Sequence, residues 1–278
     1  YSNEIIYKAF MLKMNYSKEK INVYFDRYVR LSPNNIEQNY VSVNYGGKFF
    51  SMDDALIIGA IREDIENNKN ELNEKEYSIL LASLLYSLDR SANTCGHYDS
   101  FIKKEIVRSS FKFELVNPLI DSVDDSHNII ISRQDSNELV KSLKCDVVYI
   151  DPPYSSRQYS RFYHVLENIT KWNKPKLYGE ALKPKEENMS EYCRSGAKER
   201  FTDLIKNIDA KYIIVSYNNT YNSKSSSSKN KMLLEDIKDI LTNKGKTDIL
   251  YKDFKAFNAG KTDIKDHKEI LFITKVGE

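Results

Sequence analysis

The chain has 278 residues, of which 41% are apolar and 29% are charged, and 42 Lys and Arg residues against 40 Asp and Glu residues give a net charge of +2. This composition suits a folded globular chain and excludes a histone-like polycation, so a polyanionic partner would have to be bound by a local basic patch. Three cysteines without a C-x-x-C spacing disfavour a disulfide framework or a structural zinc site, and no apolar run reaches the roughly 18 residues of a membrane span.

The first part of the chain is dominated by helix patterns. Residues 1–13 are expected to form the end of a strand followed by a helix. Ser51-Met52-Asp53-Asp54, and Asn73 with Glu76, are capping-box patterns that open two helices with apolar residues at helical spacing. Between residues 40 and 50 the sequence alternates and contains two glycines, which predicts a β-hairpin.

From residue 128 the pattern changes to short apolar runs that alternate with helix patterns. Continuous apolar strands of this kind predict an α/β domain with a parallel sheet covered on both faces. The predicted strands lie near residues 129–131, 147–150, 212–215, 248–251 and 269–274, and the predicted helices near residues 138–144, 201–208 and 233–241.

The residues that indicate chemistry are Asp151-Pro152-Pro153-Tyr154, which follow a predicted buried strand. Ligands of open α/β sheets bind at the carboxyl ends of strands. Two consecutive prolines fix the backbone and remove two N–H donors, which leaves the Pro152 carbonyl free to accept a hydrogen bond. A carbonyl, a carboxylate and a flat aromatic ring together suit the exocyclic amino group of a planar base, so all four residues are candidate catalytic residues.

This motif resembles motif IV of the amino-methylating DNA methyltransferases, and its context resembles the D12 class (Dam-like) of adenine-specific enzymes. Arg157-Gln158-Tyr159 and the residues from Tyr163 to Glu167 follow on what is expected to be one helix. The runs IVSYNN and HKEILFITK resemble the next and the last strand of that class, and LLYSLDRSANTCGHYDSFIK resembles its segment before the catalytic motif.

The resemblance implies an α/β, Rossmann-like methyltransferase sheet with a mainly helical DNA-recognition insertion. Residues 1–19 and 127–278 would then form the catalytic domain, and residues 20–126 the target-recognition insertion.

The resemblance also implies S-adenosyl-L-methionine as the cofactor, held by Asn3, Glu4, Asp135 and Asp151. Glu4 resembles the motif II acid that binds the ribose hydroxyls, and Asp135 resembles the motif III acid near the cofactor adenine. Each acid has an alternative structural interpretation. Glu4 is also typical of a helix N-terminus, and Asp135 of a helix N-cap.

Double-stranded DNA is the expected partner, with Lys48, Asn93, Arg157 and Tyr159 as candidate DNA-binding residues. Lys48 follows two glycines in the predicted hairpin, and Asn93 lies in the turn after the second capped helix. Because the target amine is paired within a duplex, the base has to be extruded before the reaction.

One family feature is not found in this sequence. The Gly-rich cofactor loop F-x-G-x-G has no match, and Tyr45-Gly46-Gly47-Lys48 fits the recognition hairpin better. We therefore expect the chain to begin just past that loop, and a β-α unit to come from upstream chain or from a second polypeptide.

The sequence thus predicts a site-specific DNA methyltransferase acting on adenine N6, with a cognate restriction endonuclease as a possible partner. N4-cytosine methylation uses the same amine chemistry and is an alternative, although Asp as the first residue of the motif favours adenine. A non-catalytic DNA-binding subunit that needs a partner chain is a second alternative, suggested by the missing loop.

Overall fold

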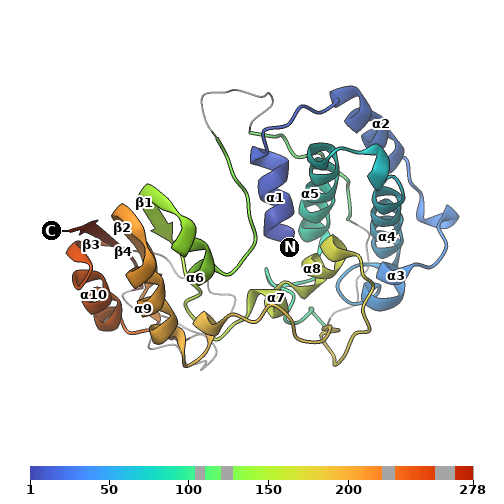
Figure 1. Cartoon of the computed structure of the whole chain (residues 1–278). Coiled ribbons are helices and arrows are strands. Elements are labelled where there is room, and N and C mark those ends of the chain that lie inside the picture. The colour runs from blue at the N-terminus through green and yellow to red at the C-terminus, as the bar shows by residue number, and fades with distance from the viewer. Residues whose placement is uncertain (104–109, 120–127, 221–228, 254–266, 278) are drawn as a thin grey trace. The chain divides into compact units, whose positions relative to one another are not determined.

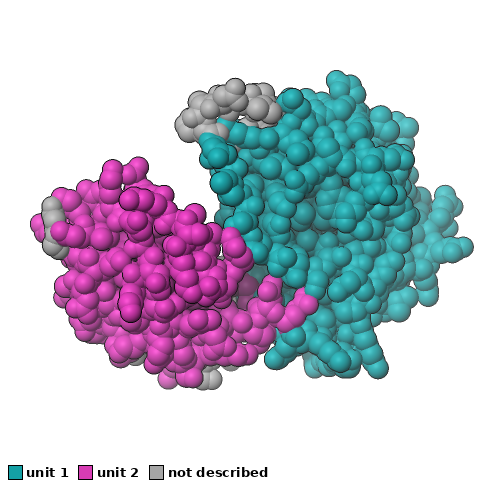
Figure 2. All heavy atoms as spheres, in the orientation of Figure 1, with its two compact units in different colours: residues 1–133, 160–186 teal, residues 134–159, 187–278 magenta. Residues whose placement is uncertain are grey.

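A computed structural model of the chain describes residues 1–103, 110–119, 128–220, 229–253 and 267–277. These residues form two compact units, coloured separately in Figure 2. The helical unit comprises residues 1–133 and 160–186, and the sheet unit comprises residues 134–159 and 187–278. Among the described residues, no helix is long and apolar enough to cross a membrane.

The helical unit is built around one long central helix (Figure 1). This helix, α5, contacts α1, α2, α4 and α8 and buries Leu80, Leu81, Leu84 and Leu88 completely. The helices assigned to the unit are α1 (Ser2–Met11), α2 (Lys18–Tyr28), α3 (Tyr40–Tyr45), α4 (Met52–Asn67), α5 (Glu74–Ser91), α7 (Tyr159–Phe162, whose first residue belongs to the sheet unit) and α8 (His164–Lys171), with the 3-10 turns η1 (Pro33–Asn35) and η2 (Lys69–Glu71).

Both predicted helix starts are confirmed. The Ser51 side chain accepts a hydrogen bond from the backbone N–H of Asp54 at 3.0 Å, which caps α4. At α5, the Asn73 side chain accepts from the Glu76 N–H and the Glu76 carboxylate accepts from the Asn73 N–H, which is a complete capping box.

The predicted hairpin at residues 40–50 is wrong. Residues 40–45 form helix α3, because Asn39 caps the N–H groups of Val41 and Ser42 while the Ser42 hydroxyl accepts from the Asn39 N–H. Helix α3 ends at the buried Tyr45 and is followed by a tight turn, in which Gly47 has a φ of +71°. The sequence alternation therefore comes from a short helix and a turn, not from two strands.

Two further expected strands are absent from the described residues. The chain enters α1 at Ser2, so no strand end precedes Glu4. The apolar run at residues 129–131 has no regular structure, and Ile130 is 82% exposed. Apolar residues alone do not make a strand where no neighbouring chain pairs with them.

The sheet unit contains a four-stranded sheet in the order β1-β2-β4-β3, with α9 and α10 packed on one face (Figure 1). Its strands are β1 (Lys144–Ile150), β2 (Asp209–Asn218), β3 (Gly245–Asp253) and β4 (Lys268–Val276). Its other elements are α6 (Ser136–Leu139), η3 (Val140–Ser142), η4 (Glu191–Cys193), α9 (Ala197–Asn207) and α10 (Leu234–Thr242).

The α/β prediction is confirmed for these elements, as are the predicted strands near residues 147–150, 212–215, 248–251 and 269–274. The helix expected near residues 138–144 begins two residues earlier and is divided into the short α6 and the 3-10 turn η3. The prediction of a parallel sheet is wrong for the described strands, because only β1 and β2 are parallel while β4 runs antiparallel to both of its neighbours. The Rossmann-like arrangement and the recognition insertion stay predictions.

Strand β1 lies at one edge of this sheet. Its side chains Val147 and Tyr149 are 52% and 61% exposed, whereas Ile213 and Val215 of β2 are buried. An edge strand presents backbone groups that can pair with a further strand.

The buried guanidinium of Arg62 joins α4 to the end of α8. It donates to the backbone carbonyls of Ile169 at 2.6 Å and Thr170 at 3.2 Å, and it pairs with Glu66 at 2.9 Å. The guanidinium also lies over the Trp172 ring, with its central carbon 5.0 Å from the ring centroid.

We expect Arg62→Leu to lower the free energy of unfolding by about 3 kcal/mol, because two buried carbonyls and a carboxylate lose their donor. The matched control is Arg27→Leu, which removes a half-exposed ion pair with Asp64 and should cost about 1 kcal/mol or less. Urea titration of both variants measures the difference. Equal losses of unfolding free energy in the two variants would show that the buried Arg62 contributes no more to stability than the half-exposed Arg27.

Candidate active site

The Asp151-Pro152-Pro153-Tyr154 segment begins directly where β1 ends. The Tyr154 hydroxyl donates a hydrogen bond of 2.7 Å to Oδ1 of Asp151. Among the described residues Asp151 has no other hydrogen-bond partner, and its side chain is exposed. The second carboxylate oxygen, Oδ2, is therefore open to an approaching donor.

The loop that carries these residues is bound on both sides. The Tyr154 carbonyl accepts from the Lys231 N–H at 2.8 Å and from the Tyr217 hydroxyl at 3.2 Å. The buried Gln158 amide donates to the Ser190 carbonyl at 2.9 Å and accepts from the Ser190 N–H at 2.7 Å. These contacts hold the Asp151 carboxylate and the Tyr154 ring in place before any ligand arrives.

The Tyr154 ring is half-buried and packs edge-on against Tyr217, with 5.1 Å between ring centroids. Burial raises the pKa of the Tyr154 hydroxyl, and the hydrogen bond to Asp151 raises it further. The hydroxyl is therefore neutral at physiological pH and acts as a donor to Asp151.

A second carboxylate, that of Glu269 on β4, is close enough for the charge of Asp151 to act on it. Glu269 is in register with Asn218 at the end of β2, the strand end beside Asp151. Burial raises the pKa of the Glu269 carboxyl, and the negative charge of Asp151 raises it further. No spacing in the sequence links Glu269 to Asp151, because only the pairing of the strands brings the two residues to the same part of the sheet.

A cavity of about 410 Å³ lies beside Asp151 within the sheet unit. Its lining is mostly apolar and comes from α6, η3, β1, η4 and α9, together with Pro152 and Pro153. The lining residues with polar side chains include Ser136, Asp151, Ser190, Tyr192 and Asp209. Burial raises the pKa of Tyr192 to about 12, so its hydroxyl also stays neutral. A mostly apolar cavity with a few polar groups is typical of a small-molecule site.

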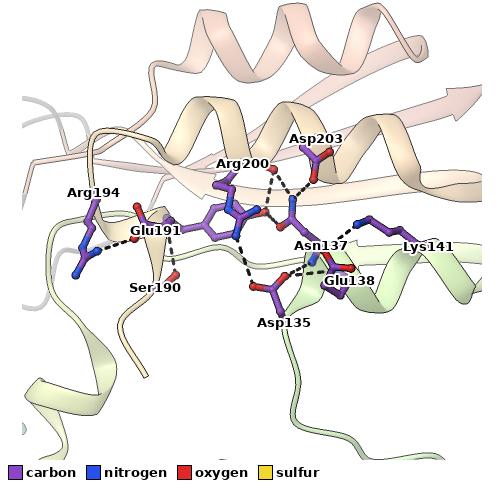
Figure 3. Close-up of polar contacts among 10 residues, drawn as sticks. Asp135, Asn137, Glu138, Lys141, Ser190, Glu191, Arg194, Arg200 and Asp203 are labelled. Carbon is purple, nitrogen blue, oxygen red and sulfur yellow. Dashed lines mark hydrogen bonds and ion pairs between the residues drawn. The ribbon is translucent and has the colours of Figure 1, made fainter. Parts of the chain in front are cut away.

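Asp135 begins helix α6 beside this cavity. Its Oδ1 accepts from the backbone N–H groups of Asn137 at 2.9 Å and Glu138 at 3.3 Å, so it is the N-cap of the helix. Its Oδ2 lies 3.9 Å from the Arg200 guanidinium (Figure 3).

Asn3 and Glu4 lie in the first turn of α1, in the helical unit. Oε1 of Glu4 pairs with Lys8 at 2.7 Å, and Oε2 pairs with Arg133 at 2.9 Å. The hydrogen bond from Lys8 is the main cause of the lowered pKa of Glu4. Asp135 and Asp151 belong to the sheet unit, so a single site formed by all four predicted cofactor residues stays a prediction.

The structure brings two of the predicted DNA-binding residues together. The Asn93 amide donates to the Lys48 carbonyl at 2.9 Å and to the Ile102 carbonyl at 2.8 Å, which ties the turn after α3 to the loop after α5. Arg157 and Tyr159 lie instead in the sheet unit, where Tyr159 is exposed.

The single helix expected from Arg157 onward is wrong. Arg157 and Gln158 precede α7, and Tyr163 separates α7 from α8 with a non-helical ψ of 31°.

Comparison with known proteins identifies relatives along nearly the whole chain. The family described as D12 class N6 adenine-specific DNA methyltransferase matches residues 3–223. The type II methyltransferase M.NlaIII of Neisseria lactamica is 30% identical over 279 aligned positions, covering 96% of this chain and 80% of that protein. The modification methylase StsI of Streptococcus sanguinis is 40% identical over 187 positions, covering 66% of this chain and 27% of that protein.

A viral relative, the type II methyltransferase M.CviAII of Paramecium bursaria Chlorella virus 1, is 31% identical over 85% of this chain and 70% of its own length. No solved structure matches the chain. The family match spans most of the chain and includes the loop after β1. The chain belongs to the D12 class of N6 adenine-specific DNA methyltransferases.

Proposed function

We propose that the chain transfers a methyl group from S-adenosylmethionine to adenine N6 in DNA, as the modification methylase of a restriction-modification system. The observation that carries the proposal is the Asp151 carboxylate, held by Tyr154 at the end of β1 with one oxygen open. The names of the relatives, which include type II methyltransferases and modification methylases, support the restriction-modification role.

The residues of the loop suit an exocyclic amine. One amine hydrogen is donated to Oδ2 of Asp151 and the other to the carbonyl of Pro152, which orients the nitrogen lone pair away from both acceptors. The Tyr154 ring stacks on the base and keeps its plane fixed. Because the two acceptors are already in position, the loop needs little reorganisation when the base enters.

The cavity beside Asp151 suits the cofactor, because it offers apolar walls for a flat ring and hydroxyls for polar edges. We propose Asn3, Glu4, Asp135 and Asp151 as the residues that bind it. When bound, S-adenosylmethionine supplies the electrophilic methyl group. The protein residues orient the amine and accept its hydrogen bonds, and the proton lost from nitrogen passes to solvent.

Double-stranded DNA is the proposed partner, with the target base extruded from the duplex. We assign sequence recognition to the helical unit, where Lys48 and Asn93 lie together, and strand contacts to Arg157 and Tyr159. A further polypeptide segment paired along the exposed edge of β1, and a cognate restriction endonuclease, complete the proposed partners.

Asp151→Ala is expected to lower kcat roughly 100-fold or more, since the amine loses one of its two orienting acceptors, while the melting temperature changes little. The matched control is Asp146→Ala, which removes an exposed carboxylate of β1 that pairs with Lys211 of β2. Methyl transfer from labelled cofactor to target DNA measures both variants. Near wild-type turnover by the Asp151 variant would exclude its proposed role.

Tyr154→Ala is expected to weaken capture of the extruded base by about 1–3 kcal/mol, the usual contribution of a base–aromatic stack. Tyr154→Phe retains the ring but loses the hydrogen bond to Asp151, so it should fall between wild type and Ala. The fluorescence of 2-aminopurine at the target position reports extrusion. If Tyr154→Phe and Tyr154→Ala are equally impaired, base capture depends on the Tyr154 hydroxyl and not on stacking by the ring.

Lys48→Ala is expected to lower DNA affinity. If Lys48 contacts phosphate, the slope of the logarithm of the binding constant against the logarithm of the salt concentration should fall in magnitude by about one. Relaxed site preference would instead indicate contact with a base edge. Lys69→Ala, at an exposed lysine paired with Glu66 in the same unit, is the control. Unchanged affinity and unchanged site preference across the salt series would remove Lys48 from the interface.

A further inference from the structure

A buried amide connects the short helix α6 to α9 (Figure 3). Asn137 is 1% exposed. Its side-chain nitrogen donates to the Arg200 carbonyl at 2.9 Å and to Oδ2 of Asp203 at 2.7 Å. Its side-chain oxygen accepts from the Tyr192 hydroxyl at 2.9 Å.

These contacts use the amide fully. Two N–H groups have two acceptors and the carbonyl oxygen has a donor, so neither a carboxylate nor an apolar side chain can replace the group. The hydrogen bond from Asn137 is the main cause of the lowered pKa of Asp203, which stays ionised as the acceptor. Asp203 is held in turn by the Asn207 amide at 3.0 Å.

The elements joined in this way form two walls of the cavity beside Asp151. Ser136 and Leu139 of α6 line it, and so does Tyr192 of η4. Helix α6 has only four residues, which is too short to hold its own position. The backbone N–H of Asn137 is also one of the two groups capped by Asp135. The Asn137 side chain therefore holds two parts of the site. It fixes α6, which carries Ser136 and is capped by Asp135, and it binds the Tyr192 hydroxyl of η4.

We propose that Asn137 is a positioning residue for the cofactor site, which sets the separation of the cavity walls formed by α6 and Tyr192. This inference rests on the proposed function, because it assumes that the cavity takes S-adenosylmethionine. Asn137 itself does not line the cavity. It acts through Ser136, Asp135 and Tyr192.

The test measures S-adenosylmethionine binding to the full-length protein by calorimetry, together with kcat at saturating cofactor and the melting temperature. Asn137→Asp places a carboxylate against Asp203 and should raise the dissociation constant about five- to tenfold, with kcat at saturation within about twofold of wild type. Asp203 lies outside the cavity lining and is only partly buried. Asp203→Ala, which leaves the Asn137 amide without one acceptor, should act in the same direction.

Two controls separate positioning from general stability. Asp203→Asn keeps an acceptor oxygen and should restore binding close to wild type. Thr274→Val removes the buried hydroxyl contact with Thr247 at 2.9 Å, away from the cavity, and should lower the melting temperature without changing the dissociation constant.

Unchanged cofactor affinity in both Asn137→Asp and Asp203→Ala, with only the melting temperature lowered, would overturn the inference. If Asn137→Asp fails to fold, the dissociation constants of Asp203→Ala and Asp203→Asn are compared instead. Equal affinities in these two variants would overturn the inference. Failure of the wild-type protein to bind S-adenosylmethionine even when the segment proposed to pair along β1 is supplied would instead overturn the proposed function, so the two failures are distinguishable.

Discussion

The hydrogen bond from Tyr154 to Asp151 is the interaction on which the site depends. It fixes one carboxylate oxygen and leaves the other open, and it couples the orientation of the acid to that of the ring. The bond joins two residues that are separated by two prolines, whose fixed φ angles limit the conformations of the segment between them. Since the Tyr154 carbonyl is anchored by Tyr217 and Lys231, the pair is held by the sheet and by the segment before α10.

Around this pair, the polar groups of the sheet unit are arranged by long-range contacts. Gln158 binds both backbone groups of Ser190, which fixes the chain that leads to Tyr192. Asn137 binds Tyr192 from the other side. The cavity is therefore bounded by backbone held through two buried amides, each of which is satisfied by groups distant in sequence. Buried amides that are fully bonded specify one arrangement, because every alternative leaves an unpaired group.

The sequence predicts the parts of this structure that depend on local contacts. The capping pairs at Ser51 and Asn73 are local, and so are the apolar runs of β1 and β4, and all four were assigned correctly. The hairpin prediction for residues 40–50 is wrong because helix α3, with six residues, gives too few turns to show its period. The motif at Asp151 was found because its four residues are consecutive. Asn137, Gln158 and Glu269 were missed, because their partners lie across the fold and no spacing indicates them.

The two acids assigned to the cofactor by resemblance differ in what the structure leaves them free to do. Asp135 uses only Oδ1 to cap α6, and its Oδ2 lies 3.9 Å from Arg200, beyond hydrogen-bond distance. It can therefore accept a further donor without losing its cap. Glu4 has both oxygens paired with cations, at 2.7 and 2.9 Å. A ribose hydroxyl would have to share or displace one of these cations, and the partly exposed Arg133 is the easier one to displace, because its side chain is 41% exposed against 18% for Lys8. An N-cap and a cofactor ligand are thus compatible roles for Asp135, whereas a cofactor role for Glu4 requires rearrangement of its ion pairs.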